Sequence, residues 1–553
     1  MYKTLLATLL TLLTLHVAAQ PKWLKKARKS QLNIITYDAA GQLLHSTNGF
    51  LVGNEGTAIT DYTSFRGAER AVAIDEKGKE YPVTAIEGAS SLYDVIRLHI
   101  DGIKASPLPL ASSHAAKGEN AYVMPYLSNK SGVGTEIAVS DVANFEQRFA
   151  YYTLPIRPSE KSASCPVMNA QGEVLGILQM SAKTDEQKCY AISADYVLSL
   201  SITALSATAS DYRDLLIRKA LPADASQAAS FIYLIGTRDT ATYLAYVDDY
   251  IRLFPDQSNG YTMKAEMLAA QQLYTDADAV WQQALDAKVT ADDIHYSRAR
   301  TIFAAAQANK QPDNWTLDQA LQEAETAFNI NPQPVFTALE GHILYAQKQY
   351  AEACRKFLDV NKTKMRSPDN FLYAAQCQQM LQDTAAVLAM QDSAVACFTK
   401  PYIESAAPAL LMRAQTLLSL GRYRQAVADL NDYEHLKARQ VNENFYYQRY
   451  QAEMQCRMFQ QALSDIERAA KMAPQEPLFQ AELAATHYRF NQLDEAISAA
   501  RAAIALDNNF PDAHRILGIC LRAQGKEAEA RTALQQAAQL GDETALKLLN
   551  QKP

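Results

Sequence analysis

The chain has 553 residues, of which 48% are hydrophobic and 20% are charged, and its formal net charge is -7. A single hydrophobic core rarely extends beyond about 300 residues, so this length predicts at least two domains. The acidic balance lacks the basic surface that nucleic-acid binding requires, which argues against a nucleic-acid partner.

Residues 1–19 have the pattern of a secretory signal peptide. Lys3 supplies a positive charge, the run from Leu5 to Val17 is largely apolar, and Val17-Ala18-Ala19 offers small residues for cleavage before Gln20. The run is shorter than the roughly 20 apolar residues of a membrane span, and no other stretch of the sequence approaches that length. We therefore expect an exported protein, periplasmic or extracellular, without a membrane span.

Residues 20–31 form a basic stretch after the expected cleavage site. The simplest interpretation is a solvated N-terminal arm. Contact with an anionic lipid or polymer is the alternative. The basic residues are Lys22, Lys25, Lys26, Arg28 and Lys29.

The region from Leu32 to about Leu200 is typical of short β-strands separated by turns. Gly41, Asn54-Glu55-Gly56 and Lys77-Gly78 supply turn signals between runs rich in β-branched residues. Their regular spacing predicts an all-β barrel, and a second set of strands predicts another. The expected strands are residues 33–37, 49–52, 57–60, 71–74, 94–98, 120–124, 136–139, 174–180 and 190–192.

One stretch, KSASCPVMNAQGEVLGI from Lys161 to Ile177, resembles the nucleophile loop and following strand of trypsin-like serine proteases. That family writes roughly GNSGGPLVN-x-x-GEVIGI, and the residues from Pro166 onward fall largely in register with it. The family's nucleophilic serine falls on Ala163, and Lys161 stands where a glycine is usual.

Two earlier segments are similar to the HtrA-like branch of the same family. The segment 48–68 resembles the one that carries the general-base histidine, which falls on Thr63. The segment 93–100 resembles the one that carries the triad aspartate, which falls on Asp94. The resemblance implies a trypsin-like double β-barrel over residues 32–200 with a degenerate catalytic triad.

The chemistry of this expected site follows from the three triad roles. Serine hydrolysis requires a hydroxyl or thiol nucleophile, an imidazole base and a carboxylate that orients the imidazole. Ala163 and Thr63 cannot supply the first two groups, so we expect a pseudoprotease with no catalytic residues. The alternative is an active serine or cysteine endopeptidase with a displaced site. Its nucleophile would be Ser162, Ser164 or Cys165, and its base His45, His99 or His114.

The seven cysteines show no CxxC pair and no ligand spacing typical of zinc, so no metal site is expected. Export permits disulfides, but at most one is expected, because five of the seven fall in helical patterns where free cysteine packs as a small core residue. A Cys165–Cys189 bridge stays open, although the predicted meander places a strand between the two. No glycine-rich phosphate loop occurs, and no cofactor is expected.

From about Ala207 to Pro553 the pattern changes to helical spacing, with a first amphipathic stretch from Asp211 to Ala220. Eight alanines then recur at separations of 43, 33, 33, 40, 36, 34 and 34 residues. This period resembles the tetratricopeptide repeat, a helical hairpin that stacks because one hairpin cannot bury its own apolar face. The two long gaps predict insertions at 309–314 and 398–406, and residues 542–550 predict a capping helix. The alanines are Ala277, Ala320, Ala353, Ala386, Ala426, Ala462, Ala496 and Ala530.

The repeat resemblance implies that a protein or peptide binds the concave face of an all-α solenoid spanning residues 207–553. Five tyrosines fall on the expected first helices of hairpins, where they either contact this ligand or pack between repeats. The two regions together predict an exported, non-catalytic binding or scaffold protein. The alternative is an active endopeptidase that uses the repeats to recruit substrates. The tyrosines are Tyr261, Tyr373, Tyr446, Tyr447 and Tyr450.

Overall fold

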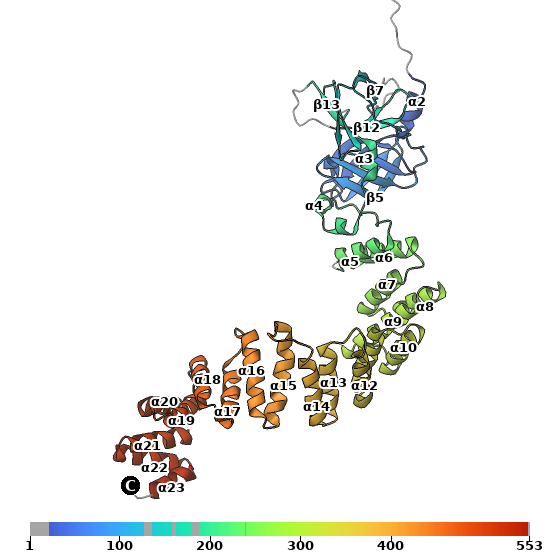
Figure 1. Cartoon of the computed structure of the whole chain (residues 1–553). Coiled ribbons are helices and arrows are strands. Elements are labelled where there is room, and N and C mark those ends of the chain that lie inside the picture. Colours follow the sequence, from blue (N-terminus) through green and yellow to red (C-terminus); the bar gives the residue numbers. More distant parts are fainter. Residues whose placement is uncertain (1–20, 127–134, 158–161, 180–186, 238, 551–553) are drawn as a thin grey trace, which may run out of the picture. The chain divides into compact units, whose positions relative to one another are not determined.

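The computed structural model describes residues 21–126, 135–157, 162–179, 187–237 and 239–550 (Figure 1). The predicted signal peptide, residues 1–19, and Lys161 of the expected nucleophile loop lie outside the described residues. The chain divides into two compact units, one that ends at Thr290 and one that begins at Ala291. The strands belong to the first unit, which also contains the first few helices.

The first six strands close into an antiparallel barrel in the order β1-β2-β3-β6-β5-β4. Alternate residues of β1, such as Leu32 and Ile34, are fully buried, because successive side chains of a strand point to opposite faces. A short 3-10 helix, η2 (Thr63–Phe65), follows β3. The barrel strands are β1 (Gln31–Tyr37), β2 (Leu43–Leu51), β3 (Thr57–Thr60), β4 (Arg70–Ile74), β5 (Glu80–Ser90) and β6 (Val95–Ile100).

The other seven strands form an antiparallel sheet in the order β8-β7-β11-β12-β13-β10-β9. Strand β12 is the continuation of the nucleophile-like stretch, and five of its six residues are buried. The strands are β7 (Asn120–Val123), β8 (Thr135–Ala138), β9 (Asp141–Phe145), β10 (Phe149–Leu154), β11 (Pro166–Met168), β12 (Val174–Gln179) and β13 (Cys189–Ser193), and the short helix α3 (Ala194–Ser199) follows them.

The basic stretch before β1 is folded onto the strands through its apolar residues, while its four lysine side chains are exposed to solvent. It contains helix α2 (Leu24–Ala27) and the 3-10 helix η1 (Arg28–Ser30). Leu24 and Ala27 are buried in the core cluster shared by the barrel and the sheet. Trp23 donates from Nε1 to the backbone oxygen of Ala170, 2.9 Å away.

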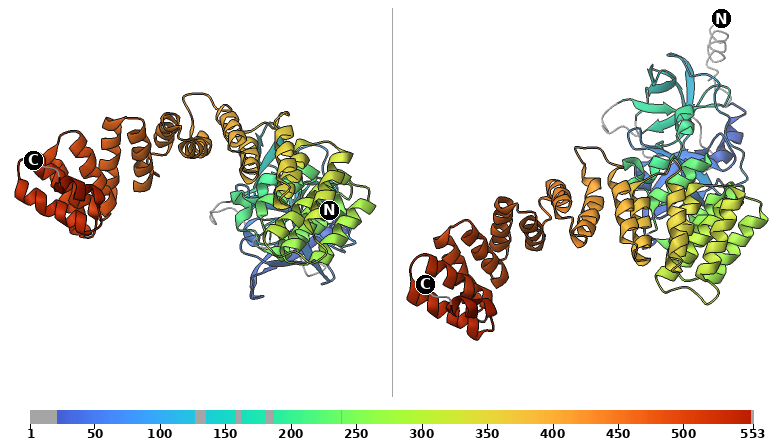
Figure 2. Two further views of the ribbon diagram at one scale, coloured as in Figure 1. Left: turned by 90° about the horizontal axis from the view of Figure 1, so that it is seen from below. Right: turned by 60° about the horizontal axis from the view of Figure 1, so that its bottom comes forward.

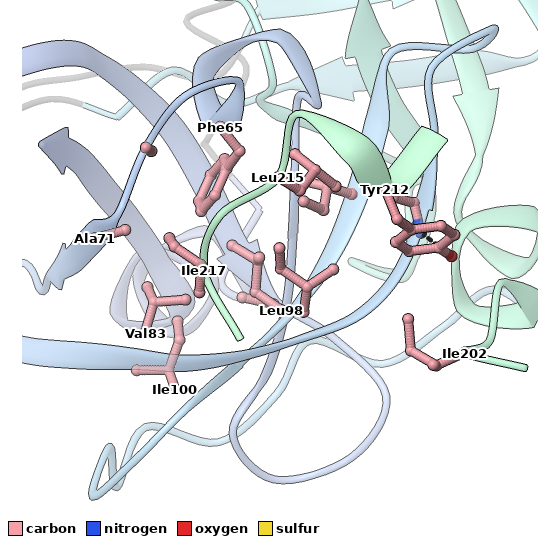
Figure 3. Close-up of a cluster of buried hydrophobic side chains, with 14 of the residues drawn as sticks. Phe65, Ala71, Val83, Leu98, Ile100, Ile202, Tyr212, Leu215 and Ile217 are labelled. Atoms are coloured by element: carbon pink, nitrogen blue, oxygen red, sulfur yellow. Dashed lines mark hydrogen bonds between the residues drawn. The ribbon is translucent and has the colours of Figure 1, made fainter. Parts of the chain in front are cut away.

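The segment 202–220 fills one end of the closed barrel (Figure 3). Only η3 (Ala204–Ala207) and α4 (Ser210–Arg213) are helical here, so the helix expected from Asp211 to Ala220 is wrong. Leu215 and Ile217 enter the barrel core beside Phe65 and Leu98. The backbone at 218–220 pairs with Ile86 of β5 at 2.8 Å on both sides. The extended conformation is preferred to a helix here because it buries alternate side chains inside the barrel.

The remaining elements are helices that pair as consecutive hairpins, and the predicted all-α solenoid is confirmed (Figure 2). Helices α5 (Ala225–Ile235), α6 (Thr240–Leu253), α7 (Ser258–Ala270) and α8 (Tyr274–Asp286) belong to the first unit. The second unit contains α9 (Ala291–Gln307), α10 (Leu317–Ile330), α11 (Pro334–Ala346), α12 (Tyr350–Val360), α13 (Pro368–Met380), α14 (Thr384–Val395), η4 (Glu404–Ala406), α15 (Ala407–Ser419), α16 (Tyr423–Lys437), α17 (Glu443–Gln455), α18 (Phe459–Met472), α19 (Pro477–Arg489), α20 (Leu493–Leu506), α21 (Pro511–Ala523), α22 (Glu527–Gln539) and α23 (Glu543–Asn550).

The marked alanines lie where paired helices cross. Seven of the eight are fully buried, and Ala386 is half-buried. Gly341 and Gly518 serve the same purpose on facing helices, because a Cβ at either position would lie within 3 Å of Phe357 or Leu534 respectively. Among the described helices, none has the length and apolar character that crossing a membrane requires.

Candidate functional site

A cleft of about 360 Å³ lies where the closed barrel meets the seven-stranded sheet. The barrel contributes part of β2, the turn around η2 and the turn before β6, and the sheet contributes the loop before β11 and the end of β12. Three positions that the sequence places in the degenerate triad, Thr63, Asp94 and Ala163, all line it. The structure therefore brings together residues from three distant parts of the chain.

Thr63 occupies one carboxylate oxygen of Asp94 with two hydrogen bonds. Its backbone N–H donates to Oδ1 at 2.8 Å and its hydroxyl donates to the same atom at 2.7 Å. Burial raises the pKa of Asp94 above its usual value, while the bonds from Thr63 lower it and the nearby Asp61 carboxylate raises it. Asp94 is thus engaged by the residue that the sequence resemblance aligns with the general base.

Ser164 faces a carboxylate rather than an imidazole. Its hydroxyl donates to Oδ1 of Asp61 at 2.7 Å, and its backbone N–H donates to the carbonyl of Leu178 at 2.8 Å. Thr47 also donates its hydroxyl to the same Asp61 oxygen. The residue sits at a φ of 58°, a left-handed conformation that is uncommon for a side chain other than Gly, Asn or Asp.

Two neighbours of Ser164 were also considered as displaced nucleophiles. Ser162 is buried, and Cys165 is fully buried. Burial raises the pKa of the Cys165 thiol to about 12, which leaves almost no thiolate near neutral pH. Cys165 precedes β11 and Cys189 begins β13, with β12 between the two strands, and none of the seven cysteines forms a disulfide.

Of the three histidines proposed as displaced bases, only His45 lines the cleft. It lies on β2 two residues before Thr47, so both side chains point to the same face of the strand. The described residues offer its imidazole no hydrogen-bond partner. His99 lies between Glu87 and Asp101, and His114 contacts Asp195 at 3.0 Å, away from the lining residues.

Two amide side chains brace the backbone of the cleft. Asn48 donates from Nδ2 to the carbonyl of Ala163 at 2.7 Å, which joins β2 to the loop before β11. Gln179 donates from Nε2 to the carbonyl of Tyr93, the residue before Asp94. The sequence did not single out Asn48, Gln179, Asp61 or Thr47, because their partners are far along the chain.

Residues 211–214, between the last strand and the helices, form hydrogen bonds and an ion pair with two loops next to the cleft. Asp214 accepts from the backbone N–H of Gly67 at 2.8 Å and pairs with Arg66 at 3.1 Å, just after the turn of Thr63. Ser91 donates to Asp211 at 2.5 Å, just before Asp94. The loops of Thr63 and Asp94 are therefore both tied to residues 211–214.

The five tyrosines predicted on the first helices of hairpins divide by exposure. Tyr261, Tyr446 and Tyr450 are buried, as expected for packing between repeats. Tyr447 is half-buried and stacks on Tyr450 with ring centroids 5.9 Å apart. Tyr373, with 37% of its surface exposed, is the member most open to a ligand.

Comparison with known proteins identifies the strand-rich part of the chain. The family model named trypsin-like peptidase domain matches residues 47–177. This stretch is similar to trypsin-like peptidase domains. The match includes Thr63, Asp94 and Ala163, and it agrees with the resemblance seen in the sequence.

Solved structures similar to this chain include bacterial proteases. The Rv3671c protease from M. tuberculosis in its active form has 16% sequence identity and a TM-score of 0.28, and the match covers 32% of this chain and 82% of that one. The serine endoprotease from Yersinia pestis has 17% identity and a TM-score of 0.29, covering 33% of this chain and 65% of that one. No curated protein sequence matches the chain.

Proposed function

We propose that this chain is an exported, non-catalytic scaffold protein in which a silent trypsin-like domain and a helical array hold a partner polypeptide. One observation supports the proposal: Thr63, which the family resemblance aligns with the general base, bonds twice to Asp94. Ala163, at the nucleophile position, has no atom that can attack a carbonyl. In this proposal the cleft serves as a binding surface and not as a site of peptide hydrolysis.

A direct test is reaction of the purified chain with a serine-directed fluorophosphonate and with unfolded casein. We expect neither labelling nor cleavage, because no hydroxyl in the cleft has an imidazole in hydrogen-bond contact among the described residues. An active bacterial trypsin-like protease serves as the positive control. Labelling of the wild-type chain that is abolished by Ser164→Ala would contradict the proposal.

The second candidate is an endopeptidase with a displaced site. The observation in its favour is that His45 and Ser164 line the same cleft. If this candidate were correct, His45→Gln and Ser164→Ala would each abolish casein cleavage, while Ser112→Ala, an exposed serine that does not line the cleft, would leave it unchanged. This pattern separates a displaced site from a contaminating protease, which no variant would affect.

The partner function is testable by capture of the tagged chain from its native envelope followed by mass spectrometry. We expect the wild-type chain to retain a partner that the Tyr373→Ala variant releases, because this tyrosine is exposed on the first helix of its hairpin. Tyr233→Ala, also exposed but on α5, is the matched control. Recovery of general chaperones alone would count against a scaffold role.

A further inference from the structure

A second cleft, of about 590 Å³, lies beneath the N-terminal arm on the first unit. Its size is within the range of about 300–1,000 Å³ that is typical of small-molecule sites. Four lysines from three separate segments line this arm cleft: Lys26 and Lys29 from the arm, Lys77 from the turn between β4 and β5, and Lys104 from the connection after β6.

The arm that carries two of these lysines is held firmly. Trp23 rests on Gly172, where a Cβ would lie 2.6 Å from the indole, and its ring meets Tyr122 edge-on at 5.6 Å. Ser30 donates its hydroxyl to the carbonyl of Ser106 at 2.6 Å. The Lys26 and Lys29 stems therefore start from a fixed backbone, so the positive charge of the arm is presented at one place.

The four ammonium groups form no close ion pair among the described residues, although Lys77 attracts the Asp75 carboxylate at longer range. In the described part of the chain, none of them lies within ion-pair distance of a carboxylate. Two carboxylates, Asp75 and Glu76, also line the cleft. Asp75 already accepts from the backbone N–H groups of Lys77 and Lys79 and from the Tyr81 hydroxyl. The cleft thus keeps an excess of positive charge on a chain whose net charge is -7.

We propose that the arm cleft binds a phosphate-bearing polyanion through Lys26, Lys29, Lys77 and Lys104. Lysine ammonium groups are compact point charges that suit phosphate oxygens. Several of them in one depression repel each other unless a multivalent anion neutralises them. A volume larger than one phosphate needs, with the Trp23 ring as one wall, favours a ligand with several phosphate groups. Such groups come either from a soluble polyphosphate or from phospholipid headgroups.

The test measures binding of tripolyphosphate to the full chain by calorimetry at low salt, and sedimentation of the chain with vesicles of phosphatidylcholine and phosphatidylglycerol. We expect the Lys26→Gln/Lys104→Gln double variant to bind about tenfold more weakly than the wild type. The matched control is Lys22→Gln/Lys25→Gln, which removes the same total charge at two exposed lysines of the arm that do not line the cleft.

The two probes distinguish a soluble polyphosphate from phospholipid headgroups. The two double variants show whether the arm cleft is the binding site. Binding to tripolyphosphate identifies a soluble ligand, and binding to vesicles alone identifies headgroups. In either case, selective loss in the Lys26→Gln/Lys104→Gln variant supports the arm cleft. Equal loss in both double variants, or no binding of either probe by the wild-type chain, overturns it. Unchanged circular dichroism excludes misfolding as the cause of a loss.

Discussion

Thr63 binds the same oxygen of Asp94 twice, through its backbone N–H at 2.8 Å and its hydroxyl at 2.7 Å. Both residues sit in turns, one after β3 and the other before β6. The pair thus joins two loops across the mouth of the cleft. This bond is a structural use of an acidic residue that, by the family resemblance, corresponds to the one that orients a histidine.

The Thr63→Val variant is expected to lose about 0.5–1.5 kcal/mol of unfolding free energy at pH 7, because a hydroxyl bonded to the half-buried Asp94 carboxylate is removed. Thr63→Ser keeps the hydroxyl and should retain most of the stability. Urea unfolding of the two variants and the wild type checks this. Equal stability of all three would show that the hydroxyl bond contributes nothing.

The pH dependence of this effect follows from the raised pKa of Asp94. A carboxyl whose folded pKa is raised stabilises the folded state at low pH, and that contribution is lost as pH rises above its unfolded value of about 3.9. The Thr63 hydroxyl favours the charged form, so Thr63→Val raises the pKa of Asp94 further. The stability difference between Thr63→Val and the wild type should therefore be larger at pH 7 than at pH 4.

Cys165 is expected to resist thiol reagents in the native chain. Its thiol is fully buried, and burial raises its pKa to about 12. Iodoacetamide at pH 8 should modify the half-buried Cys397 and Cys456 well before Cys165, and peptide mass spectrometry would record the order. Rapid modification of Cys165 in folded protein would instead indicate a reactive, accessible thiol and would favour the endopeptidase alternative.

Leu215 and Leu216 offer a matched pair on the segment that fills the barrel. Leu215 is fully buried in the barrel core, whereas Leu216 has 53% of its surface exposed. Leu215→Ala should cost about 2–5 kcal/mol of unfolding free energy, since it leaves a cavity. Leu216→Ala should change it by no more than about 0.5 kcal/mol. Similar costs for the two, measured by urea unfolding, would mean that the segment does not occupy the barrel.

Glu453 on α17 makes the helical array sensitive to alkaline pH. Burial and the nearby Asp465 carboxylate raise its pKa to about 8, although Arg449 opposes the shift, and its Oε2 atom has no hydrogen-bond partner. Arg449 is already held by Asp465 at 2.6 and 2.9 Å. Ionised Glu453 therefore adds an uncompensated negative charge to a buried network.

Because the folded pKa of Glu453 is raised, its stabilising contribution is present below its unfolded value of about 4.3 and is lost as pH rises to about 8. Glu453→Gln should raise the melting temperature at pH 8.5 and change it little at pH 5. Glu467→Gln, exposed on α18, is the control and should show no such pH dependence. A pH-independent effect of Glu453→Gln would exclude titration of this group.

Strands with clear patterns were predictable from the sequence, and those with irregular residues were not. The strand expected at 57–60 matches β3. Strand β5 was missed because it contains Pro82 and Gly88, which ordinarily argue against a strand. In the structure Gly88 lets Leu200 approach, since a Cβ there would lie 2.7 Å from Leu200 atoms. The polar edge strand β9 and the strands β10 and β11 were missed as well.

The period of the alanines predicted the helical hairpins well because a small residue is required wherever two helices cross closely. The insertion expected at 309–314 lies between α9 and α10, and the one at 398–406 lies between α14 and α15. The expected capping helix is α23. Segment 211–220 was predicted as helical because its apolar spacing gives no sign of the barrel end that it fills.

The cleft was predicted only in part. The family resemblance gave Thr63, Asp94 and Ala163, which line one cleft. The Ser164–Asp61 bond joins residues 103 positions apart, and no local pattern announces such a contact. Its geometry depends on how the barrel and the sheet meet, which the sequence does not specify locally.

The filled barrel end has a practical consequence for anyone who expresses a fragment of this protein. A fragment cut at the family match, residues 47–177, omits strands β1 and β13 and the segment that carries Leu215, and it truncates β2 and β12. The barrel would lose strand β1 and the segment 202–220 that fills its end. The exposed interior and the unpaired strand edges would favour aggregation. A soluble fragment must start near Pro21 and continue through α6, whose Tyr246 and Tyr250 belong to the same core.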